Sequence, residues 1–103
     1  ERARAAVQEA IALIDISGNQ RFLAMATTTL ARIHDVQGNR VQATATYREA
    51  FTLYESAGDL PGLLRAQFHY SRFLAKDDAY AAARLGKEVR DRATKIGLVL
   101  STC

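Results

Sequence analysis

Apolar residues recur along most of the chain at spacings of three and four, the period of an α-helix with one buried face. The clearest case is 79–96, where an apolar stripe faces a polar one. The apolar stripe is Ala82, Leu85, Val89, Ala93 and Ile96, and the polar stripe is Arg84, Glu88, Asp91 and Lys95. A broader apolar face in 40–57 comprises Val41, Ala43, Ala45, Tyr47, Ala50, Phe51 and Tyr54. No segment alternates with a period of two, so the pattern predicts no strands.

Helix-ending signals divide the chain at regular intervals. Gly18-Asn19, Gly38-Asn39 and Gly58-Asp59 stand 20 residues apart, and Asp77-Asp78 follows near the place of a fourth pair. Glycine suits the left-handed conformation that closes a helix, and an Asn or Asp side chain can accept a bond from a free N–H at the next helix start. Five helices are therefore predicted, at about 2–17, 20–37, 40–57, 60–76 and 79–96. Their short connections make neighbours antiparallel.

One twelve-residue stretch of the sequence recurs in similar form 40 residues later. QEAIALIDISGN at 8–19 aligns with REAFTLYESAGD at 48–59, with identical residues at four of the twelve positions. A helical hairpin repeated at a fixed period indicates a stacked helical array. The alternative is an ordinary bundle of helices of similar length, and the recurrence of identical residues in register favours the array.

The spacing in 30–50 resembles the tetratricopeptide repeat. In that pattern a large and a small residue of the first helix precede a small, an aromatic and a small residue of the second. The matching residues are Leu30, Ala31, Gly38, Ala43, Tyr47 and Ala50, and weaker matches are Ala3, Val7, Ala10, Ala82, Gly86 and Val89. The period here is 40 and not 34, and Thr27 and Glu55 stand near the family's Trp and Pro positions. The longer-period repeat resembles those of large bacterial signalling proteins. These include regulators joined to nucleotide-binding switch domains, nucleotide cyclases and peptide-sensing transcription regulators.

The resemblance covers 1–97 and implies an all-α, right-handed α-α superhelix of five helices, about two and a half antiparallel hairpins. We take 1–103 as a single repeat domain, and because it starts at Glu1, inside a predicted helix, as a fragment of a longer protein. The implied function is a scaffold that binds a protein or peptide within a larger regulator, in the cytoplasm. The lysine-and-asparagine clamp of chaperone-binding members is not matched.

In the family, the first helix of each hairpin lines the concave face, here the helices 20–37 and 60–76. The candidate contact residues are Met25, Thr28 and Arg32 on the first, with Thr29 and Val36 beside them, and Arg65, His69, Arg72 and Lys76 on the second. The last four share one stripe, beside a core side of Leu63, Ala66, Tyr70 and Leu74. Cationic groups on one wall of a groove favour an acidic partner. The alternative is an ordinary solvated helix face.

The sequence contains no recognisable catalytic or metal-binding motif. No phosphate-binding loop, nucleophile elbow or Cys/His pair is present, so the sequence predicts no enzyme and no cofactor. A metal site needs three or four converging ligands, and His34, His69 and the remote Cys103 do not suggest one. Asp77-Asp78 is better explained as a helix cap than as a catalytic carboxylate pair. Thr27-Thr28-Thr29 is unusual within a helix, and either close packing or a hydroxyl contact could explain it.

The distribution of charge and of apolar residues bears on whether nucleic acid or a membrane is a partner. The net charge is +3, but 1–59 carries −1 and 60–103 carries +4. Nucleic-acid binding is disfavoured because Glu88 and Asp91 interrupt the basic residues of the last helix. No apolar run is long enough to span a membrane, and one cysteine allows no internal disulfide, which fits a reducing compartment.

A structural or oligomerisation segment with no separate ligand is the main alternative function. The first helix lacks a hairpin partner, and Leu98-Val99-Leu100 follows Gly97 with no polar residue to shield it. Exposed ends of a helical array can pair, so a homodimer is a further expectation.

Overall fold

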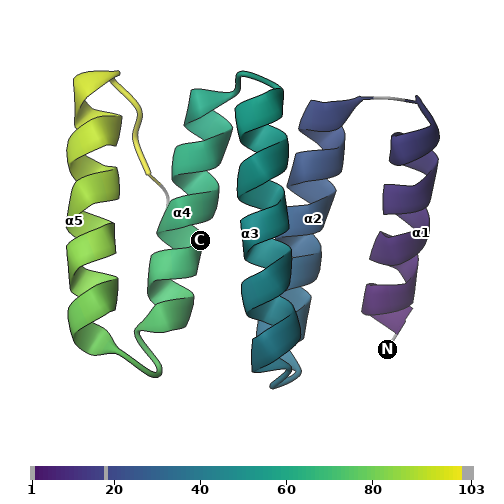
Figure 1. Ribbon diagram of the computed structural model, residues 1–103, viewed down its shortest axis with the longest axis horizontal. Coiled ribbons are helices and arrows are strands. Elements are labelled where there is room, and N and C mark those ends of the chain that lie inside the picture. Colours follow the sequence, from purple (N-terminus) through teal and green to yellow (C-terminus); the bar gives the residue numbers. More distant parts are fainter. Residues whose placement is uncertain (1, 18, 101–103) are drawn as a thin grey trace. The chain divides into compact units, whose positions relative to one another are not determined.

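The computed structural model describes residues 2–17 and 19–100, except the side chains of 13–17. The described residues form five α-helices and no strand (Figure 1). The helices are α1 (Arg2–Ser17), α2 (Gln20–Val36), α3 (Arg40–Ser56), α4 (Leu60–Leu74) and α5 (Ala79–Lys95). The predicted all-α class and the five predicted helices are confirmed, with every end within two residues of its expected place. No described helix has both the length and the apolar character needed to cross a bilayer.

The chain divides into two compact units, Glu1–Asp59 and Leu60–Cys103, and each is described separately. In the first unit α2 packs against both α1 and α3, and in the second unit α4 packs against α5. Successive helices within each unit run antiparallel (Figure 1). The predicted hairpins α2–α3 and α4–α5 are therefore both present.

The helix-ending role of Gly38 and Gly58 is confirmed. Both have positive φ, +79° and +67°, and each lies two residues after the last residue of a helix, Val36 or Ser56. The two turns close with the same bonds: Asn39 N–H donates to the His34 carbonyl at 2.8 Å, and Asp59 N–H donates to the Tyr54 carbonyl at 3.0 Å. These 6→1 bonds are typical of the Schellman motif, in which glycine accepts the left-handed conformation without strain. Gly18, the first of the three predicted glycines, lies outside the described residues.

The predicted N-caps are confirmed in part. Asn19 accepts a bond from the Phe22 N–H at 3.3 Å, and Asp78 accepts one from the Ala81 N–H at 3.0 Å. Asn39 precedes α3 but makes no side-chain capping bond, so the prediction for its side chain is wrong. The Asp59 carboxylate lies 3.4 Å from the Arg21 guanidinium, an ion pair within the first unit.

Small residues form the contact between α2 and α3. Ala24 and Ala31 of α2 and Ala43 and Ala50 of α3 have no exposed surface, and Tyr47 is almost as deeply buried. Alanines at a helix contact let the two axes approach closely. The predicted apolar face of α3 is wrong at two positions, because Val41 is 81% exposed and Ala45 is exposed. Both lie on the outer side of the helix.

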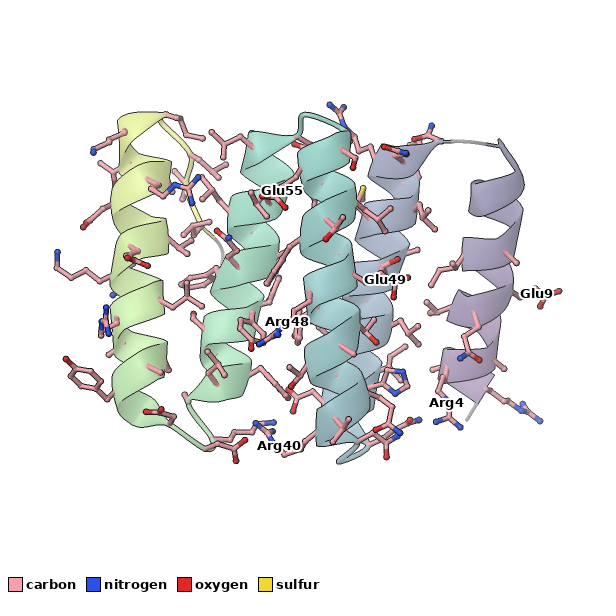
Figure 2. All side chains as sticks on the ribbon, viewed as in Figure 1. Arg4, Glu9, Arg40, Arg48, Glu49 and Glu55 are labelled. Carbon is pink, nitrogen blue, oxygen red and sulfur yellow. The ribbon has the colours of Figure 1, made fainter. Side chains whose placement is uncertain are left out.

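Helix α1 is less deeply packed than its neighbours. None of its described side chains is fully buried, and the half-buried ones are Arg4, Val7, Ala10 and Ile11. Glu9 projects from α1 on the side away from α2 (Figure 2). The expected repeat position Ala3 is exposed.

The second unit has its own apolar core. Leu64 and Phe68 of α4 pack with Val89 and Ala93 of α5, and Leu85, Leu98 and Leu100 lie against this cluster, half-buried. The chain after α5 turns back alongside the hairpin (Figure 1), which explains the position of Leu98 and Leu100. The expectation that 98–100 is unshielded is therefore wrong for these two leucines and holds for Val99. Ile96, predicted in the apolar stripe, is exposed and lies directly after the last residue of α5, Lys95.

Replacing Gly58 with alanine tests the turn after α3. No atom lies within 4 Å of the position a Cβ would take, so only the positive φ opposes the substitution. We expect Gly58→Ala to lower the free energy of unfolding by about 1–2 kcal/mol, measured by urea unfolding followed by circular dichroism. Ser56→Ala, an exposed change two residues earlier, is the control and should leave the midpoint nearly unchanged. A Gly58→Ala midpoint equal to that of the control would contradict this account of the turn.

Candidate functional site

The predicted basic stripe lies on α4 for most of its length. Arg65 and Arg72 are exposed and His69 is half-buried, and their spacing of four and three places them on one face of the helix. Lys76, predicted as the fourth member, is not on the helix, because α4 ends at Leu74 and Lys76 lies in the following turn. From here on, "the basic stripe" means Arg65, His69 and Arg72.

Almost everything else on α4 is covered. Its buried residues are Gly62, Leu63, Leu64, Ala66, Phe68, Ser71 and Phe73. From Gly62 to Leu74, all within the described residues, the only exposed side chains are Arg65 and Arg72. The predicted core side is correct for Leu63 and Ala66, which are buried, and for Tyr70 and Leu74, which are half-buried. The sequence did not predict that burial would extend so far around the helix.

A second candidate face runs along α2. Met25 is 50% exposed, Val36 is 85% exposed, and Thr29 and Arg32 are also exposed, all on one side of the helix. Phe22, one turn before Met25, is 54% exposed as well. This α2 face, Phe22, Met25, Thr29, Arg32 and Val36, is therefore largely apolar, with one cation.

Thr28 does not belong to the α2 face. It is buried, and its hydroxyl donates to the Ala24 carbonyl at 2.9 Å. It lies between Ala24 and Ala31 on the inner side of the helix, so its side chain is not presented to a partner with Met25 and Arg32. Position on the wheel could have indicated this, because Thr28 lies four residues after one buried alanine and three before another.

The three consecutive threonines share one type of bond. The hydroxyls of Thr27, Thr28 and Thr29 donate to the carbonyls of Leu23, Ala24 and Met25, each four residues earlier. This back-bonding satisfies a buried hydroxyl without a partner from another helix. Both open interpretations therefore apply, since Thr27 and Thr28 are also buried small residues.

The histidines do not converge with other ligands. His34 is buried in the first unit and its Nδ1 has no hydrogen-bond partner, while His69 is half-buried on α4. Among the described residues no group of three or more His, Cys, Asp or Glu side chains is placed to hold a metal ion. Cys103 lies outside the described residues.

Two hollows lie beside α5, on different faces of the helix. The first, of about 420 Å³, is lined by Phe68, Ser71, Arg72, Ala75, Ala79, Ala82, Ala83, Gly86 and Arg90. The second, of about 340 Å³, is lined by Gln67, Leu85, Glu88, Val89, Asp91 and Arg92. Arg72 joins the first hollow to the basic stripe. Arg90 is not among the contact residues that the sequence predicted.

Comparison of the chain with known proteins gives no similarity to report. No protein-family model matches it, and no match was found among curated proteins or solved structures.

The charge of the last helix is partly neutralised on its outer face. The Lys87 ammonium lies 3.1 Å from the Asp91 carboxylate, an exposed pair one turn apart. Such a pair adds little stability, but it places a negative group among the basic residues that a phosphate backbone would contact.

The hydroxyl of the buried Tyr47 has a raised pKa. Burial, as the larger cause, and the negative charge of Asp35 together raise the pKa of this hydroxyl from 10.0 to about 12, against the opposing positive charge of Arg32. The side chain is 1% exposed and lies at the contact of α2 with α3. The cation of the α2 face is thus electrostatically coupled to the core beneath it.

The shifted Tyr47 makes stability depend on alkaline pH. Above pH 10 the unfolded chain loses the phenolic proton while the folded chain keeps it until about pH 12. The free energy of unfolding should therefore fall between these values, by up to about 2–3 kcal/mol. Urea unfolding across this range tests it, with Tyr47→Phe expected to flatten the decline. Tyr80→Phe, which removes a hydroxyl from a largely exposed ring, should keep the wild-type slope; identical slopes in all three proteins would contradict the assignment.

Proposed function

We propose that this chain is a tetratricopeptide-like helical-repeat scaffold that binds a protein or peptide, favouring an acidic partner. The proposal places it in a right-handed superhelix within a larger regulatory protein of bacterial type, in the cytoplasm, and gives it no catalytic role. It is supported by the two antiparallel hairpins, the matching glycine turns after α2 and α3, and the small-residue contact of α2 with α3.

The observation that carries the proposal is the exposure pattern of α4. Between Gly62 and Leu74 of α4, Arg65 and Arg72 are the only exposed residues, with the half-buried His69 between them. Most side chains of α4 are buried or half-buried, so the two guanidinium groups extend from a packed helix. Guanidinium groups match carboxylates in geometry and charge, and a pre-formed pair of cations attracts acidic segments before contact.

A second function, self-association, is favoured by one specific observation. The α2 face exposes Phe22, Met25 and Val36 within one side of a single helix. Neighbouring apolar side chains of this size on a surface often mark a contact with another protein. A second copy of this chain covering the α2 face would make the segment an oligomerisation element, which sedimentation over a concentration range distinguishes from a monomeric scaffold.

The charge reversal Arg65→Glu with Arg72→Glu tests the basic stripe. The probe is a fluorescein-labelled helical peptide of Ala, Leu and Glu, about five turns long, with fluorescence anisotropy as the readout. We expect saturable binding to the wild type and a loss of at least about tenfold in affinity in the double variant, with unchanged helicity by circular dichroism.

The control for the stripe is the double variant Arg84→Glu with Lys95→Glu. It makes the same change in net charge on α5, at exposed positions outside the stripe. Full binding by the control together with loss in the stripe variant supports the proposal. Equal loss in both would mean that total charge and not the stripe governs binding, and undiminished binding in the stripe variant would reject the site.

A further inference from the structure

We infer that the groove between α4 and α5 docks an acidic amphipathic helix of a partner protein. The groove is the hollow of about 420 Å³ lined by Arg72 and Arg90, and all its lining residues belong to the second unit. This inference rests on the proposed role in protein binding and names the partner's secondary structure, its charge and the surface it contacts.

The floor of the groove is made of small side chains. Ala79, Ala82, Ala83 and Gly86 follow one side of α5, and Ala75 closes the floor where α4 has ended. From Ala79 to Gly86 is two turns of helix, or about 10 Å. At the exposed Ala79 and Ala83 the small side chains let a second helix approach with its own backbone close to the floor, whereas Gly86 is covered by the Arg90 guanidinium.

The two walls carry cations from different helices. Arg72 comes from α4, and Arg90 comes from α5, one turn after Gly86. The Arg90 guanidinium lies back over Gly86, since a Cβ added at Gly86 would be 3.2 Å from Arg90 Nη1 and 3.7 Å from Ser71 Oγ. The absence of a side chain at Gly86 thus gives Arg90 the room to lie at the groove. A helix in the groove meets a guanidinium on each flank.

The charge of the groove selects an acidic occupant. No Asp or Glu is among its lining residues, and the segment 60–103 carries a net charge of +4. The other hollow beside α5 differs in this respect, because Glu88 and Asp91 accompany Arg92 there. An occupant with Asp or Glu along both flanks complements the first hollow and is repelled by the acids of the second.

The groove also offers little polar recognition apart from its arginines. The buried Ser71 hydroxyl donates its hydrogen to the Phe68 carbonyl at 2.7 Å. The floor is therefore suited to apolar or small side chains and not to an extended backbone that needs donors and acceptors along its length. The helix that fits this groove has alanine-like residues on one face and carboxylates on both sides of that face.

Two single substitutions test the groove without touching Arg65 or Arg72. Arg90→Glu reverses one wall, and Ala83→Leu fills the floor at an exposed position without changing charge. Against the labelled Ala/Leu/Glu helix of about five turns, we expect each to weaken binding by at least about tenfold. The matched controls are Lys95→Glu and Ala45→Leu, the same changes at exposed positions outside the groove, and both should bind as the wild type does.

The outcomes separate the groove from the basic stripe. Loss of binding in the Arg65→Glu, Arg72→Glu protein with full binding by Arg90→Glu and Ala83→Leu would refute the groove and leave the stripe standing. No binding by the wild type would refute both. Equal binding of unstructured polyglutamate, or complete displacement of the helix by inorganic phosphate, would show that charge alone is read and would overturn the helical occupant.

A second copy of this chain could also occupy the groove, and this case must be distinguished from a separate partner protein. If sedimentation shows a wild-type dimer that Arg90→Glu or Ala83→Leu converts to a monomer, the groove holds a second copy of this chain and the inference of a separate partner is overturned. A wild type that stays monomeric and binds the acidic helix with the expected pattern of losses supports the inference.

Discussion

The close approach of helices through alanine is the contact on which the first unit depends. Helix α2 packs against α3, and Ala24 and Ala31 of α2 and Ala43 and Ala50 of α3 have no exposed surface. A larger side chain at any of them would force the axes apart and remove the packing around Tyr47. The threonines of α2 fit the same requirement, because Thr27 and Thr28 are small and bond to their own helix. Dense packing of small groups thus takes the place of a large apolar core in this unit.

The second unit packs differently, with consequences for its surface. Its core uses larger residues, Leu64, Phe68 and Val89, and the returning segment adds Leu98 and Leu100. Small residues remain on α5 but lie at the edge of the hairpin, where Ala79 and Ala83 are exposed. The type of surface that joins two helices in the first unit is therefore open to solvent in the second, beside two arginines. This juxtaposition is the physical basis for placing a helical partner there.

The sequence predicted some residues of the candidate site correctly and others wrongly. The stripe spacing identified Arg65, His69 and Arg72 correctly as neighbours on one helix face, because the 3.6-residue period fixes that relation. It failed for Lys76, where the helix had already ended, and for Thr28, which lies on the inner side of α2. Arg90 was missed as a groove residue because its position depends on an empty space at Gly86 and on α4 opposite, neither of which a one-helix pattern describes.

The sequence by itself determined the number of helices, their limits and the turns after α2 and α3. These features are local: the glycine conformation, the Asn19 and Asp78 caps and the apolar period each act within a few residues. Only the tertiary structure decided which side chains are covered. Val41 and Ile96 look apolar enough for a core yet are exposed, while α4 is buried around most of its circumference. Burial depends on which helices pack against each face, and that choice is made by residues far away in the sequence.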